Sequence, residues 1–174
     1  MDSVFALLGK DFAIVAADAS AARSILVFSH DQDKIVKLDE HKLMVAAGTP
    51  ADNSNFTEYV SKNLKLYELN NDMKLGCAAS AHFVRNCMAK ALREGPYQTN
   101  LLLAGYDAHD GVSLYAIDYL AYLTKPKFGA HGYASNFILS VFDRDWKENM
   151  NEAEALEVRD EGKRVPATSV NHAT

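Results

Sequence analysis

Two continuously apolar runs open the sequence VFALLGKDFAIVAA, residues 4–17, and they constrain the fold more than any other stretch. Val4 to Leu8 and Phe12 to Ala17 flank a short turn that contains Gly9. Apolar runs joined by a short glycine-containing turn predict an antiparallel hairpin. Because neither run alternates with polar residues, both faces of these strands are expected to be covered. The stretch therefore predicts a sheet that lies between two other layers.

Further strands are predicted on both sides of a central helical region. The candidates are Ser24 to Ser29, Ile35 to Leu38, Leu43 to Ala47, Asn100 to Gly105, Val112 to Asp118 and Ala121 to Leu123. The cluster Asp107 to Gly111 ends in Asp110-Gly111, which suits a tight turn between two of these strands. Lys125-Pro126-Lys127 ends the last strand, and Phe128 to Gly132 is expected to be a glycine-rich loop.

Four helices are predicted from apolar residues that recur at spacings of three and four. Asp52 or Ser54 is expected to cap the first helix, and Gly95-Pro96 is expected to end the second. The predicted helices run from Ala51 to Leu69, from about Cys77 to Arg93, from Ala134 to Phe142, and from near Asn151 to Val158. Their apolar stripes are interpreted as core-facing surfaces.

The order of these elements is strands, two helices, strands, then two helices. This order favours an α+β domain with two antiparallel sheets over an alternating βαβ arrangement. Since the strands are doubly covered, the expected architecture is a four-layer helix-sheet-sheet-helix sandwich over residues 1–158. Residues 159–174 are polar, carry a charge run and contain Pro166, so they are predicted to form a flexible tail.

Composition excludes several functional classes. The chain has 174 residues, a formal net charge of −5 and 48% hydrophobic residues, which suits one globular domain and argues against nucleic-acid binding. No apolar run reaches the roughly 20 residues that span a bilayer, and the N-terminus does not resemble a signal peptide. Cys77 and Cys87 are predicted to be buried free thiols in a reducing compartment. The expectation is a soluble intracellular protein without membrane contact.

Few residues suggest catalytic chemistry by themselves. No glycine-rich phosphate loop and no nucleophile elbow is present. The segment Asp107-Ala108-His109-Asp110 holds three potential metal ligands, but a solvated hairpin turn explains it. No metal and no cofactor is therefore predicted.

Asp18 and Lys34 stand out by their positions. Asp18 directly follows an apolar strand, and Lys34 lies between an acidic loop and the next strand. A neighbouring cation lowers the proton affinity of a hydroxyl, so such a pair can help activate a nucleophile. The residues alone favour the alternative interpretation, in which the two form a structural ion pair.

Several longer segments carry a resemblance to a known family. Together they resemble the β-type subunits of the proteasome over residues 1 to about 158. The segments are Ala16-Ala17-Asp18, Asp33-Lys34-Ile35, residues 43–48 (LMVAAG), residues 56–67 (FTEYVSKNLKLY), residues 96–107 (PYQTNLLLAGYD), residues 114–121 (LYAIDYLA) and residues 129–133 (GAHGY). The segment at 97–107 is the specific signal, whereas the first hairpin alone is not.

The resemblance implies the N-terminal-nucleophile hydrolase fold, which agrees with the four layers inferred above. In active members the nucleophile is an N-terminal threonine, which supplies both a hydroxyl and an amine base. An aspartate and a lysine that assist it fall on Asp18 and Lys34, and the backbone donor for the oxyanion falls on Gly48. The nucleophile position is occupied by Asp2, whose carboxylate has no proton to give up at neutral pH. The serine-rich loop of active members reads Gly129 to Tyr133 here, so the resemblance implies a vestigial framework and a non-catalytic subunit.

The resemblance also implies partners and a location. It implies a structural subunit of the 20S core particle that contributes to β-ring assembly for ubiquitin-dependent and other proteasomal protein degradation. Its neighbours would be other β subunits in the same and the opposite β ring, α-ring subunits and assembly chaperones, in the cytoplasm and nucleus. Cofactors, nucleic acid and membranes have no part in this expectation.

Two alternatives stay open at this point. Ser3 would be the nucleophile of an active peptidase if Met1 and Asp2 were removed. The chain would otherwise be a free-standing binding module or a truncated isoform that does not assemble. Family members continue after the fourth helix into two strands that complete a sheet, whereas the match here fades at about Val158. One sheet is therefore expected to expose an unpaired edge.

Overall fold

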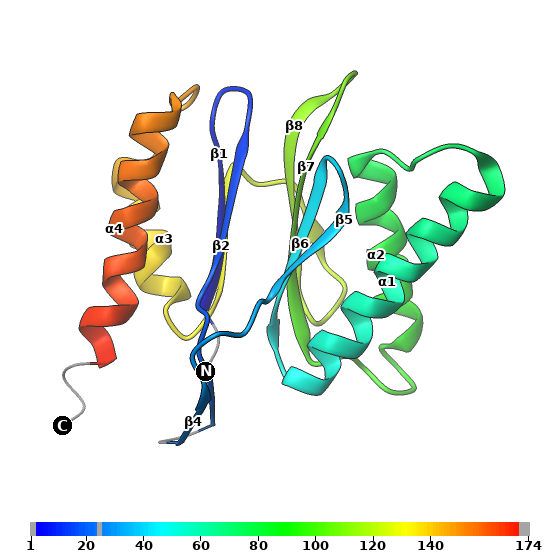
Figure 1. The fold of residues 1–174 in the computed structure, drawn as a ribbon, viewed down its shortest axis with the longest axis horizontal. Coiled ribbons are helices and arrows are strands. Elements are labelled where there is room, and N and C mark those ends of the chain that lie inside the picture. Colours follow the sequence, from blue (N-terminus) through cyan, green and yellow to red (C-terminus); the bar gives the residue numbers. More distant parts are fainter. Residues whose placement is uncertain (1–2, 24–25, 171–174) are drawn as a thin grey trace.

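The computed structural model describes residues 3–23 and 26–170, which form short strands and four helices (Figure 1). Their bounds are β1 (Ser3–Leu8), β2 (Ala13–Ala17), β3 (Ala21–Arg23), β4 (Leu26–Ser29), β5 (Ile35–Asp39), β6 (Lys42–Gly48), α1 (Pro50–Asn71), α2 (Cys77–Ala91), β7 (Thr99–Asp107), β8 (Gly111–Ile117), β9 (Leu123–Thr124), β10 (Phe128–Gly132), α3 (Ser135–Asp145) and α4 (Glu152–Val170). Within these ranges, none of the helices combines the length and the apolar character needed to cross a bilayer.

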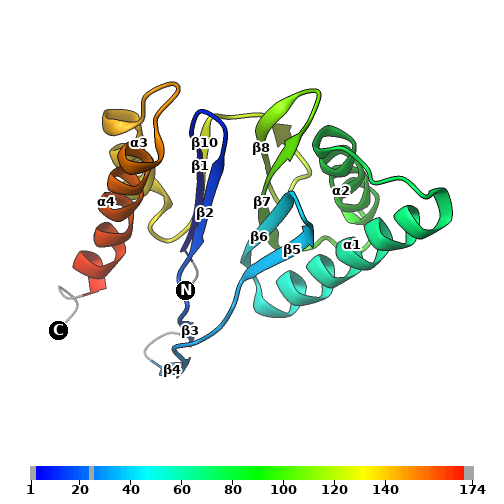
Figure 2. The same cartoon turned by 45° about the horizontal axis from the view of Figure 1, so that its top comes forward.

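Two antiparallel sheets lie face to face between two helical layers, which confirms the predicted fold class (Figures 1 and 2). One sheet has the strand order β10-β1-β2, and α3 and α4 cover its outer face. The other has the order β5-β6-β7-β8-β9, and α1 and α2 cover its outer face. The first hairpin pairs β1 with β2 as the sequence predicts, from Val4 opposite Ala17 to Leu8 opposite Ala13.

Strand β1 lies at the centre of the molecule, and all six of its residues are buried. Val4 and Ala6 face the second sheet, where they pack against residues such as Leu102. Phe5 and Leu7 face the helices, and the Phe5 ring meets the Phe142 ring of α3 edge-on at 5.4 Å between centroids. Two apolar faces on alternating residues explain why the sequence of this strand is apolar without interruption.

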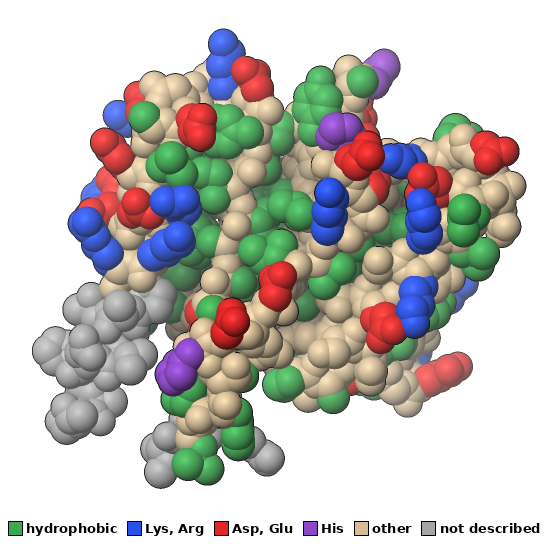
Figure 3. All heavy atoms as spheres, in the orientation of Figure 1, with side chains coloured by type: hydrophobic (Ala, Val, Ile, Leu, Met, Phe, Trp, Pro, Cys, Tyr) green, Lys and Arg blue, Asp and Glu red, His purple; other side chains and the backbone are tan. Residues whose placement is uncertain are grey.

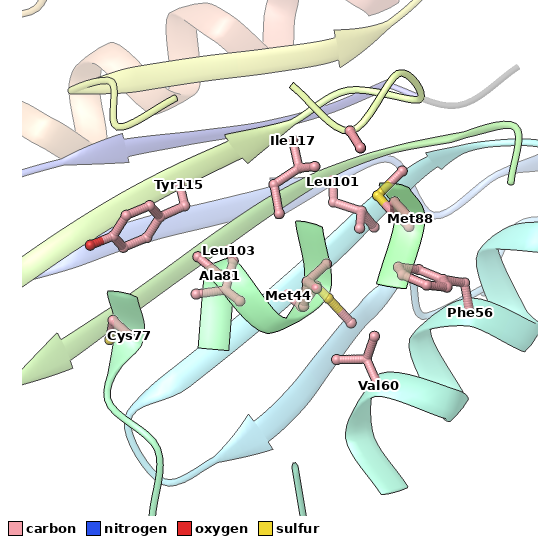
Figure 4. Close-up of a cluster of buried hydrophobic side chains, with 13 residues drawn as sticks. Met44, Phe56, Val60, Cys77, Ala81, Met88, Leu101, Leu103, Tyr115 and Ile117 are labelled. Atoms are coloured by element: carbon pink, nitrogen blue, oxygen red, sulfur yellow. The ribbon is translucent and has the colours of Figure 1, made fainter. Parts of the chain in front are cut away.

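A third apolar layer joins the second sheet to α1 and α2 (Figure 4). Phe56 and Val60 of α1 are fully buried against Met44 of β6. Ala81 and Met88 of α2 contribute from the neighbouring helix, which confirms that the apolar stripes of both helices face the core. Burial of these side chains holds the helices in place, since each large side chain contributes about 1.5–3 kcal/mol relative to exposure.

The segment that precedes α3 differs from the sequence prediction. Phe128–Gly132 was expected to be a loop, but it forms β10 and pairs with β1 from Ser3 opposite Gly132 to Leu7 opposite Phe128. Gly129 explains part of the difference: a Cβ at this position would lie 3.1 Å from Leu102 Cδ2, so its glycine allows the two sheets to approach closely. Gly129 is therefore needed for the close packing of the two sheets and not for a turn.

Helix α4 is longer than the sequence predicts. The expectation of a flexible tail from Arg159 is wrong for residues 159–170, which continue the helix to Val170. Gly162 accounts for the packing of this extension, because a Cβ there would lie 3.2 Å from the Phe142 ring and 3.7 Å from the Phe5 ring. The glycine lets α4 approach α3 and the sheet closely. Residues 171–174 lie outside the described ranges.

Two predicted strands are shorter than expected. Of the segment Ser24 to Ser29, Leu26–Ser29 forms β4 and pairs with β3 in a separate hairpin, whereas residues 24 and 25 are not described. The hairpin projects from the lower end of the molecule in Figure 1. Of Ala121 to Leu123, only Leu123 is in a strand, because Ala121 adopts a left-handed turn with φ of 61°.

The two cysteines are free thiols, as predicted, but they differ in exposure. Cys77 at the start of α2 is fully buried, whereas Cys87 is half-buried. Burial and the nearby Asp107 carboxylate raise the pKa of Cys77 to about 11, and burial raises the pKa of Cys87 as well.

We expect iodoacetamide at about pH 8 to modify Cys87 and to leave Cys77 unmodified in the folded protein. A pKa of about 11 lowers the thiolate fraction of Cys77 by roughly a hundredfold relative to the ordinary value, and burial adds steric protection. Intact-mass measurement with and without urea gives the count of labelled thiols. Labelling of both cysteines in the wild type without urea, together with labelling of Cys77 in folded Cys87→Ala, would contradict the buried position of Cys77.

Candidate functional site

Asp18 and Lys34, which are 16 positions apart, form a direct ion pair. Asp18 follows β2, and its backbone N–H donates to Ser3 O at 3.0 Å. Lys34 precedes β5 and donates from Nζ both to Asp18 Oδ1 and, at 2.8 Å, to Ser20 O. The Lys34 side chain is 7% exposed and that of Asp18 is 30% exposed. The pair therefore ties the end of the first sheet to the start of the second.

Gly48 ends β6 where the chain passes close to the start of β7. A Cβ at Gly48 would lie 2.1 Å from Gln98 O and 2.8 Å from Thr99 Cα, so no side chain fits there. The next residue, Thr49, donates its N–H to Gln98 O at 2.9 Å. The close approach of two backbones fixes the geometry at this point and accounts for the glycine.

Lys34 and Gly48 lie on one cleft, with a volume of about 1270 Å³, between the two sheets and the N-terminus of α1. Residues from both sheets and from α1 contribute to its walls: Ala21, Phe28, Gln32, Asp33, Lys34, Val36, Ala46, Ala47, Gly48, Thr49, Pro50, Ala51, Asn53, Ser54, Thr57, Gln98, Asn100, Tyr119, Gly132 and Tyr133. The structure thus brings together the two sequence-predicted residues Lys34 and Gly48, with Asp18 bonded to Lys34.

Several polar contacts at the cleft had no signal in the sequence. Asp52 was predicted as a cap of α1, but the cap residue is Thr49, without a side-chain bond, and Asp52 accepts from Gln98 N at 2.9 Å. Thr99 Oγ1 donates to Asn53 Oδ1 at 2.6 Å. Both contacts join residues 46 positions apart. Only the pairing of β6 with β7 brings them together, so local patterns could not reveal them.

The nucleophile position deduced from the resemblance, Asp2, lies outside the described residues. Ser3, the alternative nucleophile, is 8% exposed and begins β1. Its Oγ accepts a hydrogen bond at 3.3 Å from the backbone N–H of Ala134, at the start of α3. Ser3 directly follows residues that the structure does not describe, it is buried, and it is not among the residues of the cleft wall.

His131, in β10, carries a largely buried imidazole. Burial lowers its pKa, although the Asp118 charge and a backbone bond at Leu101 oppose this effect. Its Nε2 atom is buried and lacks a hydrogen-bond partner among the described residues. Because the pKa of His131 lies below its ordinary value, its imidazole is neutral in the folded protein at neutral pH.

We expect the free energy of unfolding to fall as pH drops below about 6.5. The unfolded chain then protonates His131 while the folded chain does not, so the unfolded state binds more protons and gains stability. His131→Phe should flatten this dependence in urea titrations. Replacement of His109 is the matched control. Asp110 raises the pKa of His109, so this replacement should not flatten the dependence of the free energy of unfolding on pH. An unchanged pH dependence in His131→Phe would refute this explanation.

The remaining candidate ligands do not form a metal site. Asp107 accepts a bond from Cys77 N at 2.6 Å, and His109 pairs with Asp110 at 2.9 Å on the surface. Among the residues that the structure describes, there is no group of three His, Cys, Asp or Glu side chains that could hold a metal ion. The turn interpretation of residues 107–111 agrees with this geometry.

A family model for the proteasome subunit matches residues 2–161. The chain belongs to the proteasome subunit family. It is 51% identical over 160 residues to proteasome subunit beta type-2-B of Arabidopsis thaliana, covering 92% of this chain and 80% of the relative. It is 49% identical to the beta type-2 subunit of Oryza sativa subsp. japonica, covering 92% and 76%. The beta type-2 subunit of Dictyostelium discoideum is 45% identical over 150 residues, covering 84% and 76%.

These relatives confirm the resemblance to proteasome β subunits and place this chain beside the beta type-2 members. The family fold agrees with the two sheets and four helices described above. At the position that the resemblance assigns to the nucleophile, the sequence reads Asp2-Ser3.

Proposed function

We propose that this chain is a non-catalytic structural subunit of the proteasome core particle, with its place at the fourth position of the β ring. Support comes from a cleft that keeps the Asp18–Lys34 pair and Gly48 while the nucleophile position carries Asp2. A carboxylate cannot be deprotonated to an alkoxide, and its charge repels the oxyanion that forms in peptide cleavage. The Asp18–Lys34 ion pair is proposed to hold the two sheets together.

The proposed partners are other β subunits in the same ring and in the opposite β ring, α-ring subunits and assembly chaperones. The contribution of the chain is to complete the ring in which other subunits degrade proteins, including ubiquitinated ones. The cytoplasm and nucleus are the proposed locations. Obligate assemblies of this kind need large and partly apolar contact surfaces, and exposed large side chains such as Phe28, Tyr133 and Phe137 are available for them.

The test is co-sedimentation of the tagged chain in a native extract. We expect it to migrate in a glycerol gradient with a large complex that contains α and β subunits, identified by mass spectrometry. The control is the same gradient after dissociation in urea, where the chain should move to the 19.2 kDa fractions. Recovery of the chain solely as free monomer from the native extract would overturn the proposal.

A further inference from the structure

The turn between β7 and β8, residues 108–110, projects from the upper end of the molecule in Figure 1. In Figure 3, which has the same orientation, this turn stands clear of the surrounding surface. It carries His109 and Asp110, and Gly111 follows as the first residue of β8. The sequence contains the dipeptide Asp-Gly only here, and it contains no Asn-Gly. Since glycine has no Cβ, its peptide nitrogen meets the least obstruction when it attacks the side chain of a preceding aspartate.

The surroundings of Gly111 leave its backbone free to change conformation. Its φ of 70° lies in the left-handed region, and no atom lies within 4 Å of a Cβ built at this position. Gly105 on the neighbouring strand differs, because a Cβ there would lie 2.5 Å from Cys77 Sγ. A glycine in open space moves between backbone conformations at little cost. The nitrogen of Gly111 can therefore reach the side-chain carboxyl carbon of Asp110, with which it would close a succinimide ring.

The Asp110 carboxylate has a proton donor beside it. His109 Nδ1 lies 2.9 Å from Asp110 Oδ1, and the side chains of the two residues are 98% and 54% exposed. The hydrogen bond between them raises the pKa of His109 and lowers that of Asp110, and the Lys125 charge adds to the second effect. More of His109 is therefore protonated at neutral pH than of an ordinary histidine. A carboxyl oxygen leaves as water only after it receives a proton, so this imidazolium is placed to act as a general acid.

Two other aspartates precede a small residue, but their carboxylates are held by distant parts of the chain. Asp107 accepts a hydrogen bond from Cys77 N at 2.6 Å, and Asp18 is bound to Lys34. Each of these aspartates is followed by an alanine, whose Cβ obstructs ring closure. Asp107 and Asp18 therefore serve as internal controls for the reactivity of Asp110.

We propose that Asp110 converts spontaneously to isoaspartate in the folded chain, with His109 as the general acid. The Gly111 nitrogen bonds to Asp110 Cγ while the bond from Cγ to Oδ1 breaks. The leaving oxygen departs as water, with one proton from the His109 imidazolium and the other from the Gly111 amide. Water then adds to the main-chain carbonyl carbon of Asp110 and opens its bond to nitrogen, and the released proton replaces the one that His109 gave up. The product is an isomer in which the backbone runs through Cβ and Cγ, so no oxidant or reductant is needed.

The conversion lengthens the backbone at the end of the β7–β8 hairpin by a single carbon atom. The pairing of these strands ends with Tyr106 opposite Val112 and Asp107 opposite Gly111. A longer turn displaces the last of these pairs, and Asp107 is also the residue that accepts a hydrogen bond from Cys77 N at the start of α2. Isomerisation is therefore expected to mark aged chains and to weaken the contact between this hairpin and α2.

Prolonged incubation of the folded wild-type chain at neutral pH tests the site of the reaction. Isoaspartate is quantified by a methyltransferase that labels isoaspartyl carboxylates with tritiated methyl groups, and peptide fragmentation in a mass spectrometer locates it. We expect it to accumulate at residue 110 and to stay at background level at Asp107 and Asp18. Asp110→Glu keeps the charge and should abolish the label at this position. Absence of isoaspartate at residue 110, or equal accumulation at Asp107, would overturn the proposal.

The variant His109→Gln tests the general acid. It should slow the isomerisation by about tenfold, which is less than the roughly 10²–10⁴-fold contribution of a positioned acid in an enzyme because this turn is exposed. His82→Gln removes another exposed histidine, on α2, and is the matched control that should react at the wild-type rate. The wild-type rate should also fall as pH rises through the pKa of His109, a step that His109→Gln should lack. Equal rates in His109→Gln and the wild type would overturn the assignment of His109.

Discussion

Gly48→Ala is expected to lower the free energy of unfolding by about 3 kcal/mol. The new Cβ would lie 2.1 Å from Gln98 O and 2.8 Å from Thr99 Cα, and both are backbone atoms that cannot move without disturbing β7. Thr49 N also donates to Gln98 O, so displacement of this carbonyl weakens the link between β6 and β7. Urea unfolding followed by the fluorescence of Trp146, the single tryptophan, gives the value.

Gly95→Ala is the matched control for this change. No atom lies within 4 Å of a Cβ built at Gly95, and its φ is not positive. The free energy of unfolding of the Gly95→Ala variant should therefore stay within about 0.5 kcal/mol of the wild-type value. If Gly48→Ala were as stable as Gly95→Ala, the close approach of β6 and β7 at the cleft would be wrong.

Lys34→Met is expected to lower the free energy of unfolding by about 2 kcal/mol. Removal of one partner of a buried ion pair costs about 3–5 kcal/mol, whereas exposed pairs contribute less than about 1 kcal/mol. Asp18 is partly exposed, so the cost should fall between these ranges. Met keeps the length and apolar stem of the side chain, and the loss of the bonds to Asp18 and Ser20 then dominates.

Lys37→Met, on the strand β5 that follows Lys34, is the control, because Lys37 is exposed and should tolerate the change. A second measurement distinguishes a lysine that only joins the two sheets from a lysine that takes part in catalysis. In assembled particles, Lys34→Met should leave every peptidase activity per particle unchanged. If one activity fell by several orders of magnitude while assembly stayed intact, Lys34 would be part of a working active site.

The layers of the fold could be predicted because each has a local signature. The apolar runs of β1 and β2 indicate that their sheet is covered on both faces. The spacing of Phe56 and Val60 predicts the buried face of α1. Tertiary contacts overrode local patterns at Phe128–Gly132. There, two glycines suggested a loop, whereas pairing with β1 and contact with Leu102 made a strand.

The end of α4 likewise could not be predicted from its local sequence. The polar composition after Arg159 suggested a tail, but one glycine at residue 162 allows the helix to pack on Phe142 and Phe5. A glycine inside a helix usually destabilises it, so glycine in a sequence argues against a helix. The close packing that Gly162 allows can be recognised only when the position of α3 is known. The position of a partner element cannot be read from the sequence of the segment that needs it.

The candidate site was partly predictable for a similar reason. Asp18 and Lys34 are conspicuous because they flank strand ends, and the structure places them in contact. The bonds from Gln98 to Asp52 and from Thr99 to Asn53 depend on how the start of β7 meets α1. The buried, neutral state of His131 likewise depends on the packing of β10.

The most direct test of a non-catalytic role uses a peptide epoxyketone, which reacts with a residue that presents both an N-terminal amine and a hydroxyl. Core particles that contain the tagged chain would be treated with the reagent, and the intact mass of each subunit would then be measured. We predict adducts on the threonine-bearing subunits of the particle and an unchanged mass for this chain. An adduct on the first residue of this chain would contradict the account.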